Sequence, residues 1–218
     1  MQVMGLKKRM DVTGARPVIG VSGGLDSTLA LLVCTEAARR AGRALTDVVG
    51  ITMPCFGTTG RTYNNSLALM KSLGITALEI PIKKAVEQHF SDIGHDPDKF
   101  DLTFENSQAR ERTQVLMDYA GKIGGFVAGT GDLSELALGW CTYNADHMSM
   151  YGVNCGIPKT LVRWMIDSIM EYDIFRSSSD ILRDILDTPI SPELLPPDEN
   201  GEIAQQTEDI VGPYALHD

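Results

Sequence analysis

Six consecutive residues, Ser22-Gly23-Gly24-Leu25-Asp26-Ser27, have the composition of an anion-binding loop. They follow a short β-branched run, Pro17 to Ser22, and open a segment with apolar residues at helical spacing, Asp26 to Ala41. Two adjacent glycines let the backbone turn tightly, so that several N–H groups point at one place. The N-terminus of the following helix adds partial positive charge, and the two serines add hydroxyl donors. The loop is therefore predicted to bind phosphate.

The carboxylate of Asp26 distinguishes this loop from the Walker A motif. The G-x-x-x-x-G-K-[ST] pattern supplies a lysine for the phosphates, whereas the segment from Ser22 to Ser27 contains none. A carboxylate beside a phosphate is repulsive unless a cation lies between them, and Mg²⁺ prefers carboxylate and phosphate oxygens. Asp26 thus indicates a Mg²⁺ ion beside the bound phosphate. The alternative, a simple turn followed by a helix cap at Asp26-Ser27, is weaker because the whole hexapeptide lies between strand and helix.

Thr130, Glu135 and Lys159 form the second set of candidates. Thr130 ends a strand-like run, Gly125 to Thr130, and is expected at the same sheet edge as the phosphate loop. Glu135 could then complete a two-carboxylate Mg²⁺ site with Asp26, although a solvated acid in a first helical turn is the alternative. Lys159 follows a proline at an expected helix start, where the helix dipole disfavours a cation. That position favours a role in neutralising charge at the α-phosphorus of a nucleotide.

Alternating strand and helix patterns predict the elements that position these side chains. Strands are expected at Pro17–Ser22, Asp47–Met53, Ile75–Ile82 and Gly125–Thr130, and helices at Asp26–Ala41, Arg61–Leu73, Lys83–Ile93 and Glu105–Ile123. Such alternation predicts an α/β fold with a doubly wound, mainly parallel sheet and helices on both faces. Ligands of such sheets bind at the carboxyl ends of the strands, so Met53–Arg61 joins the candidate region. Residues 139–159 are expected to form a long loop, followed by helices at Pro158–Tyr172 and Ser178–Leu186.

The composition is that of a soluble globular chain, with 43% hydrophobic and 22% charged residues among 218. No apolar run approaches the ~20 residues that cross a bilayer, and the first eleven residues lack the apolar core of a signal peptide. The four cysteines form no C-x-x-C pair, which is typical of free thiols in a reducing compartment. A cytoplasmic location without a membrane partner is therefore expected.

The net charge of −10 is concentrated at the end of the chain. All 19 Lys and Arg lie at or before Arg183, together with 20 of the 29 acids, so residues 1–183 carry −1. The last 35 residues contain the other nine acids and carry −9. A duplex nucleic-acid binder would show a basic stripe, so no nucleic-acid partner is expected.

Ser-Gly-Gly-x-Asp-Ser after a first strand resembles the loop of the PP-loop ATP pyrophosphatases, which split ATP between the α- and β-phosphates. Further motifs narrow this resemblance. Glu105 to Arg110 (ENSQAR), Gly129 to Glu135 (GTGDLSE), Asp146 to Asn154 (DHMSMYGVN) and Pro158 to Thr160 (PKT) are similar, in order and spacing, to the synthetase domain of NAD synthetases. The Asp-Leu-Ser-Glu version resembles the glutamine-dependent enzymes. The resemblance covers nearly the whole chain.

The resemblance assigns ligand contacts residue by residue. ATP contacts fall on Gly20, Val21, Ser22, Gly23, Gly24, Leu25, Asp26, Ser27, Met53, Thr130, Lys159 and Ser191. Deamido-NAD contacts fall on Asn106, Arg110, Glu135, Trp140, Cys141, Thr142, Tyr143 and Asp146. Asp26 and Glu135 would hold the metal, and both would be catalytic together with Lys159. Ordinary packing is an equally good interpretation of Cys141 and Thr142.

The resemblance also implies the reaction and the partners. The nicotinate carboxylate of deamido-NAD would attack the α-phosphorus of ATP, pyrophosphate would leave, and ammonia would convert the adenylated carboxyl into NAD and AMP. Mg²⁺ is the expected cofactor, with ammonia either free or supplied by a glutaminase domain, and a homodimer is expected. Two alternatives stay open: another PP-loop enzyme that amidates or thiolates its substrate, and a nucleotide-binding fragment without turnover.

The chain is expected to form one domain, residues 1–187, with an acidic, proline-rich segment, 188–218, as its lid. Glutamine-dependent relatives carry a large N-terminal glutaminase domain and continue beyond the equivalent of Asp218. The sequence is therefore interpreted as a fragment with a truncated C-terminus.

Overall fold

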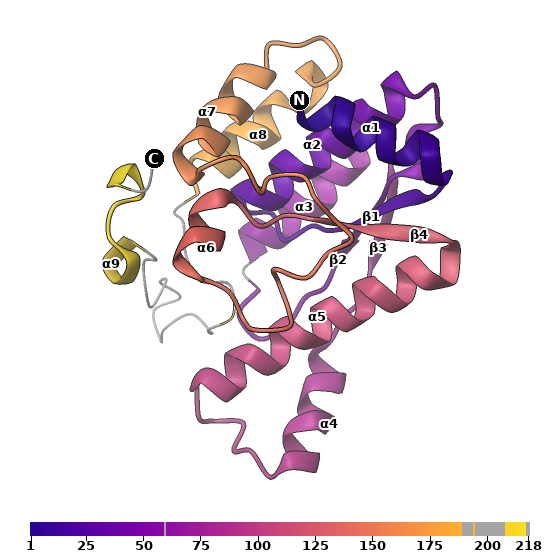
Figure 1. Ribbon diagram of the computed structural model, residues 1–218. Helices are drawn as coiled ribbons and strands as arrows, with labels where there is room; N and C mark the ends of the chain where they lie inside the picture. The colour runs from indigo at the N-terminus through magenta and orange to yellow at the C-terminus, as the bar shows by residue number, and fades with distance from the viewer. Residues whose placement is uncertain (59, 189–193, 195–207, 217–218) are drawn as a thin grey trace.

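The computed structural model describes residues 1–58, 60–188, 194 and 208–216. In this part of the chain five parallel strands form one sheet: β1 (Arg16–Gly20), β2 (Val49–Thr52), β3 (Thr76–Glu79), β4 (Gly125–Gly129) and β5 (Tyr151–Gly152). The strand order is β3-β2-β1-β4-β5, and helices cover both faces (Figure 1). The expected doubly wound α/β fold is confirmed.

The helices form two layers around the sheet (Figure 1). One layer contains α1 (Gln2–Thr13), α2 (Leu25–Arg40), α3 (Gly60–Ser72), α7 (Lys159–Ile169) and α8 (Ser179–Leu186), and the other contains α4 (Lys83–Ile93) and α5 (Leu102–Ile123). The short helices α6 (Leu133–Leu138) and α9 (Glu208–Val211) lie in connections, as do 3₁₀ turns at Leu45–Asp47, Arg176–Ser178 and Tyr214–Leu216. Neighbouring residues of β1 show the alternation: Ile19 packs into the first layer and Val18 into the second.

The order of the strands creates the position for a ligand. From β1 the chain moves outward to β2 and β3, and then returns to the opposite side of β1 to form β4. The loop after β1 and the end of β4 therefore flank the point where the strand order reverses. A doubly wound sheet leaves a crevice at this point, beyond the carboxyl ends of the strands.

Three segments differ from the sequence expectations. The first residues form α1 because Leu6 and Met10 are buried against α2, although their local pattern is weak. Within the expected loop 139–159, Tyr151–Gly152 pairs with β4 as a fifth strand. The last predicted helix ends at Leu186, yet a one-turn helix, α9, and a 3₁₀ turn are present after it. Ser191 and the rest of 189–193 and 195–207 lie outside the described residues.

Among the described residues, no helix combines the length and the apolar character that a membrane-crossing helix requires.

Phe104, in the first turn of α5, lies at the centre of an aromatic cluster. Its ring centroid is 5.1 Å from that of Phe56, 5.5 Å from Phe90 and 5.0 Å from Phe100. Phe104→Ala should lower the free energy of unfolding by about 3–5 kcal/mol, because the side chain is fully buried and leaves a cavity. Urea denaturation followed by circular dichroism measures this. Phe100→Ala is the control, because Phe100 is 56% exposed; equal losses would contradict the central position of Phe104.

Candidate active site

A cleft with a volume of about 480 Å³ opens at the carboxyl ends of β1, β2 and β4. Its walls come from the phosphate loop, Thr52–Met53, the end of β4, one face of α5, and the segment around Trp140. The size is that of a pocket for a nucleotide-sized ligand. Every predicted ATP-binding residue that the structure describes lines this cleft: Gly20, Val21, Ser22, Gly23, Gly24, Leu25, Asp26, Ser27, Met53, Thr130 and Lys159.

Hydrogen bonds within the phosphate loop hold its shape. The N–H of Gly24 donates to the hydroxyl of Ser22 at 3.2 Å, and the Ser27 hydroxyl donates to the Gly24 carbonyl at 3.2 Å. The two serine oxygens are 3.1 Å apart. The turn thus closes over the first residues of α2, where unpaired backbone N–H groups and the helix dipole favour an anion.

Gly23 is the residue on which this turn depends. It has φ +93°, and a Cβ atom at this position would lie 2.2 Å from the backbone oxygen of Thr62. Gly23→Ala should therefore lower the free energy of unfolding by about 1–3 kcal/mol and displace the loop from α3. Gly121→Ala is the control, because Gly121 lies inside α5 with open space around it, and the alanine should be neutral or stabilise by up to about 1 kcal/mol. Urea unfolding of both variants measures the difference; equal stability would show that the loop tolerates a side chain.

Lys159 lies among three carboxylates at the phosphate end of the cleft. Its Nζ contacts Oδ2 of Asp26, lies 2.8 Å from Oδ2 of Asp132 and 3.1 Å from Oε1 of Glu135. The lysine is 4% exposed. Three negative charges and one positive charge leave −2 when all four groups are ionised. The cluster therefore has capacity for a divalent cation.

The pKa values follow from burial and from this crowding of charge. Burial by itself lowers the pKa of Lys159, but the carboxylates of Asp26, Glu135 and Asp132 raise it more, so the ammonium stays charged. Burial raises the pKa of Asp26 to about 7; Lys159 opposes this shift, and the neighbouring carboxylates add to it. Burial likewise raises the pKa of Glu135 against the opposing effect of Lys159. The three acids share one lysine, and its single positive charge cannot balance all three carboxylates.

The residues present fit the expected Mg²⁺. The ligand oxygens of Asp26, Asp132 and Glu135 lie within 4.8 Å of one another. Asp26 and Glu135 line the cleft, whereas Asp132 does not. Among the described residues, Oδ1 of Asp26 is buried and has no hydrogen-bond partner. Carboxylate oxygens with excess negative charge are what Mg²⁺ binds, so Asp26 and Glu135 remain its candidate ligands.

A capping box positions the carboxylate of Glu135. Oδ1 of Asp132 accepts the N–H of Glu135 at 2.8 Å, and Oε2 of Glu135 accepts the N–H of Asp132 at 3.2 Å. One oxygen of Glu135 is thus held by the backbone, while the other faces Lys159. The sequence interpretation assigned no role to Asp132, although the D-x-x-E spacing at a helix start is the signal that could have revealed it.

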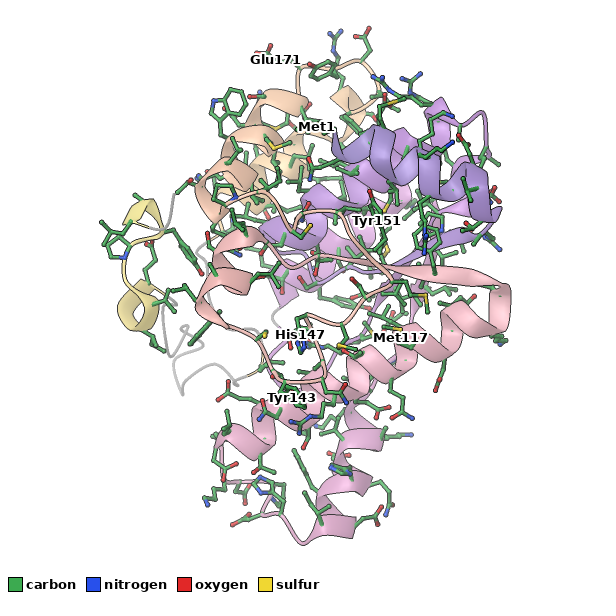
Figure 2. All side chains as sticks on the ribbon, in the orientation of Figure 1. Met1, Met117, Tyr143, His147, Tyr151 and Glu171 are labelled. Atoms are coloured by element: carbon green, nitrogen blue, oxygen red, sulfur yellow. The ribbon has the colours of Figure 1, made fainter. Side chains whose placement is uncertain are left out.

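The predicted deamido-NAD residues fall into two groups. Six line the cleft: Asn106, Glu135, Trp140, Cys141, Thr142 and Asp146. Thr142 links them, because its hydroxyl donates to Oδ1 of Asn106 at 2.8 Å and its N–H donates to Oδ1 of Asp146 at 3.0 Å. The carbonyl of Thr142 lies 3.1 Å from Nδ1 of His147, whose place beside Tyr143 is seen in Figure 2. Burial raises the pKa of Asp146.

Arg110 and Tyr143 are the two that lie outside the cleft lining. Arg110 is exposed and donates from Nε to the carbonyl of Tyr143 at 3.3 Å, while the Tyr143 side chain is 82% exposed. The face of α5 that lines the cleft includes Ala109, Thr113 and Leu116. Each residue advances about 100° around a helix, so Arg110 lies about 100° around the helix from Ala109 and beyond the edge of this face. The resemblance that assigned Arg110 to the deamido-NAD contacts does not indicate this offset.

Asn154 and Tyr214 are two further residues at the site that the sequence interpretation left without a role. Asn154 is fully buried, and its Nδ2 donates to the carbonyls of Asp26 and Thr130, at 3.0 Å each, so it joins the phosphate loop to the end of β4. Tyr214 is 4% exposed, lines the cleft, and places its ring centroid 5.6 Å from Nζ of Lys159. Burial raises the pKa of Tyr214 to about 12, so its phenol stays neutral. Asn154 and Tyr214 both reach the site through contacts with segments that are distant in the sequence.

Comparisons with known proteins agree with the geometry. Residues 2–169 match the model of the protein family described as NAD synthase. The chain is 45% identical, over an alignment of 225 residues, to the glutamine-dependent NAD(+) synthetase of Mycobacterium leprae, covering 100% of this chain and 33% of that protein. It is 35% identical over 146 residues to the NH(3)-dependent NAD(+) synthetase of Pelodictyon phaeoclathratiforme, covering 67% of this chain and 50% of the relative.

A solved structure extends the similarity to three dimensions. The glutamine-dependent NAD+ synthetase from Acinetobacter baumannii, in complex with ADP, matches with a TM-score of 0.75 and 25% identity. The match covers 87% of this chain and 35% of that one. The chain thus spans about a third of the length of the glutamine-dependent relatives.

Proposed function

Because the chain belongs to the NAD synthase family, we propose that it amidates deamido-NAD to NAD and splits ATP into AMP and pyrophosphate. The observation that carries the proposal is the composition of one cleft. The phosphate loop, Lys159 and two carboxylates line one end of it, and the linked residues Asn106, Thr142 and Asp146 line another part. A triphosphate and a second, carboxylate-bearing substrate would meet between these two groups of residues.

In the first step a carboxylate oxygen of deamido-NAD forms a bond to the α-phosphorus of ATP. The bond from that phosphorus to the bridging oxygen breaks, and pyrophosphate leaves with the electron pair. The N–H groups of the loop from Ser22 to Ser27 would hold the departing pyrophosphate. Lys159, kept charged by its carboxylates, would offset the negative charge that develops at phosphorus.

In the second step ammonia attacks the adenylated carboxyl carbon. The bond between this carbon and the AMP oxygen breaks, AMP leaves, and the proton lost from nitrogen passes to solvent. The attacking groups belong to the substrates, so the reaction requires no nucleophilic side chain. The protein would contribute orientation and a fixed arrangement of charge.

Asp26 and Glu135 would hold the Mg²⁺ ion, as their carboxylates line the cleft beside the phosphate loop. When bound, Mg²⁺ supplies positive charge that screens the triphosphate from these carboxylates. The role of the two side chains is to hold that charge at a defined place. The N–H of Asp132 fixes one oxygen of Glu135, which limits its rotation.

The test is an ammonia-dependent assay of the purified chain. ATP, Mg²⁺, deamido-NAD and ammonium should give NAD and AMP in equal amounts, separated and counted by liquid chromatography. Ammonium is the nitrogen source in this assay because one of the similar proteins is an NH(3)-dependent NAD(+) synthetase. ATP binding without AMP formation would contradict the proposal and favour a binding-only protein. AMP formation that does not depend on deamido-NAD would favour another substrate.

A further inference from the structure

Asp132 differs from the other two acids that contact Lys159. It is 0% exposed and is absent from the lining of the cleft, which Asp26 and Glu135 share with Lys159. Its two oxygens have separate partners. Oδ1 accepts the N–H of Glu135 at 2.8 Å, and Oδ2 lies 2.8 Å from Nζ of Lys159.

We infer that Asp132 is a positioning residue that holds the ammonium of Lys159 in place while Asp26 and Glu135 engage a cation at the cleft. The inference rests on the proposed function, because it concerns the lysine that serves the phosphates there. A divalent cation bound between Asp26 and Glu135 neutralises their negative charge, and it repels the ammonium of Lys159. The buried carboxylate of Asp132 then remains as the partner that keeps the ammonium where it is.

The surrounding backbone makes Asp132 and Lys159 one rigid unit. The N–H of Lys159 donates to the hydroxyl of Ser134 at 3.1 Å, and the N–H of Leu133 donates to the carbonyl of Ile157 at 2.9 Å. The first turn of α6 is thus joined to the first turn of α7. The capping bond also fixes the carboxylate of Asp132, so this carboxylate stays at a constant place relative to the backbone that carries the Lys159 stem.

A purely structural role is the alternative, in which Asp132 only caps α6. Asparagine is as good an N-cap as aspartate but carries no charge, so Asp132→Asn separates the two roles. Asp132→Ser also keeps a capping oxygen, but its side chain is too short to contact Lys159. Asp101→Asn is the matched control, because Asp101 caps α5 by accepting the N–H groups of Thr103 and Phe104.

The first measurement is binding of Mn²⁺ alone, followed by electron paramagnetic resonance. In Asp132→Asn, Lys159 depends on Asp26 and Glu135 for its charge balance and competes with the metal for them. The dissociation constant for Mn²⁺ should rise fivefold or more in the Asn and Ser variants and stay unchanged in Asp101→Asn. In the ammonia-dependent assay, kcat of Asp132→Asn should fall tenfold or more while KM for ATP changes less than threefold.

A double-mutant cycle tests whether the effect passes through Lys159. In a Lys159→Met background, Asp132→Asn should leave Mn²⁺ affinity within twofold, because the competing ammonium is gone. The inference is overturned if Asp132→Asn binds Mn²⁺ like the parent chain, or if its effect persists without Lys159. Unfolding of both the Asn and Ser variants would overturn it too, since it would make Asp132 a structural residue. If the parent chain makes no AMP, the proposed function fails while the Mn²⁺ comparison still decides the role of Asp132.

Discussion

Lys159→Met should lower the free energy of unfolding by about 3–5 kcal/mol and reduce AMP formation by about three orders of magnitude. Methionine keeps the length of the lysine stem and removes only its charge. The substitution leaves the carboxylates of Asp26, Asp132 and Glu135 together in a buried site without their cation. Breaking one partner out of a buried ionic cluster is costly because the remaining charges stay desolvated. The loss of activity follows from the loss of positive charge at the phosphate end of the cleft.

Urea unfolding and the ammonia-dependent assay measure the two effects of Lys159→Met. Lys84→Met is the control, because Lys84 lies on α4 and is exposed, and it should change stability by less than about 0.5 kcal/mol. Adding Mg²⁺ should recover part of the lost stability, since a divalent cation neutralises the abandoned carboxylates. A Lys159→Met chain as stable as the parent would show that these acids are protonated or solvated, and the proposed charge balance would be wrong.

The sheet and the phosphate loop could be predicted because their signals are local. Short β-branched runs followed by helical spacing place β1, α2, β2 and β4 within a few residues. The hexapeptide from Ser22 to Ser27 contains its own glycine turn and its own helix start, so its shape depends little on distant residues. The rule that ligands bind at the carboxyl ends of parallel strands then placed Thr130 at the same edge.

The charge cluster could be predicted only in part. Asp26, Glu135 and Lys159 were each expected near the phosphates, but nothing local indicates that Lys159 contacts all the acids at once. That arrangement needs α6 and the start of α7 to meet, through bonds such as Lys159 N–H to Ser134 at 3.1 Å. The same reason explains Tyr214, whose burial against Lys159 joins residues far apart in the sequence. Arg110 lies outside the cleft lining, because spacing along one helix gives separations between residues and not the direction of the cleft.

Asp26→Asn should raise the stability of the metal-free protein, whereas Lys159→Met lowers it. Both substitutions should reduce AMP formation. The substitution removes one of the carboxylates that compete for Lys159, and Asp132 and Glu135 remain to balance the ammonium. We therefore expect the metal-free variant to match the parent chain below about pH 4, to be somewhat more stable at pH 5, and to gain about 1–3 kcal/mol more by pH 8. AMP formation should fall by about two to three orders of magnitude, because a candidate Mg²⁺ ligand beside the phosphate loop is lost.

The difference in stability between the parent chain and Asp26→Asn should depend on pH in a definite direction. The pKa of Asp26 is raised from 3.8 to about 7 by burial, against the opposing effect of Lys159. A raised pKa stabilises the folded protein fully below the unfolded value, and this contribution is lost as pH rises through about 7. The parent chain should therefore lose stability relative to Asp26→Asn between pH 5 and pH 8, in unfolding experiments with chelator present. Asp167→Asn on α7, an exposed acid, should show no such divergence. Parallel stability curves for the parent and Asp26→Asn would mean that Lys159 fully satisfies Asp26, and that the cluster has no charge left to offer a metal.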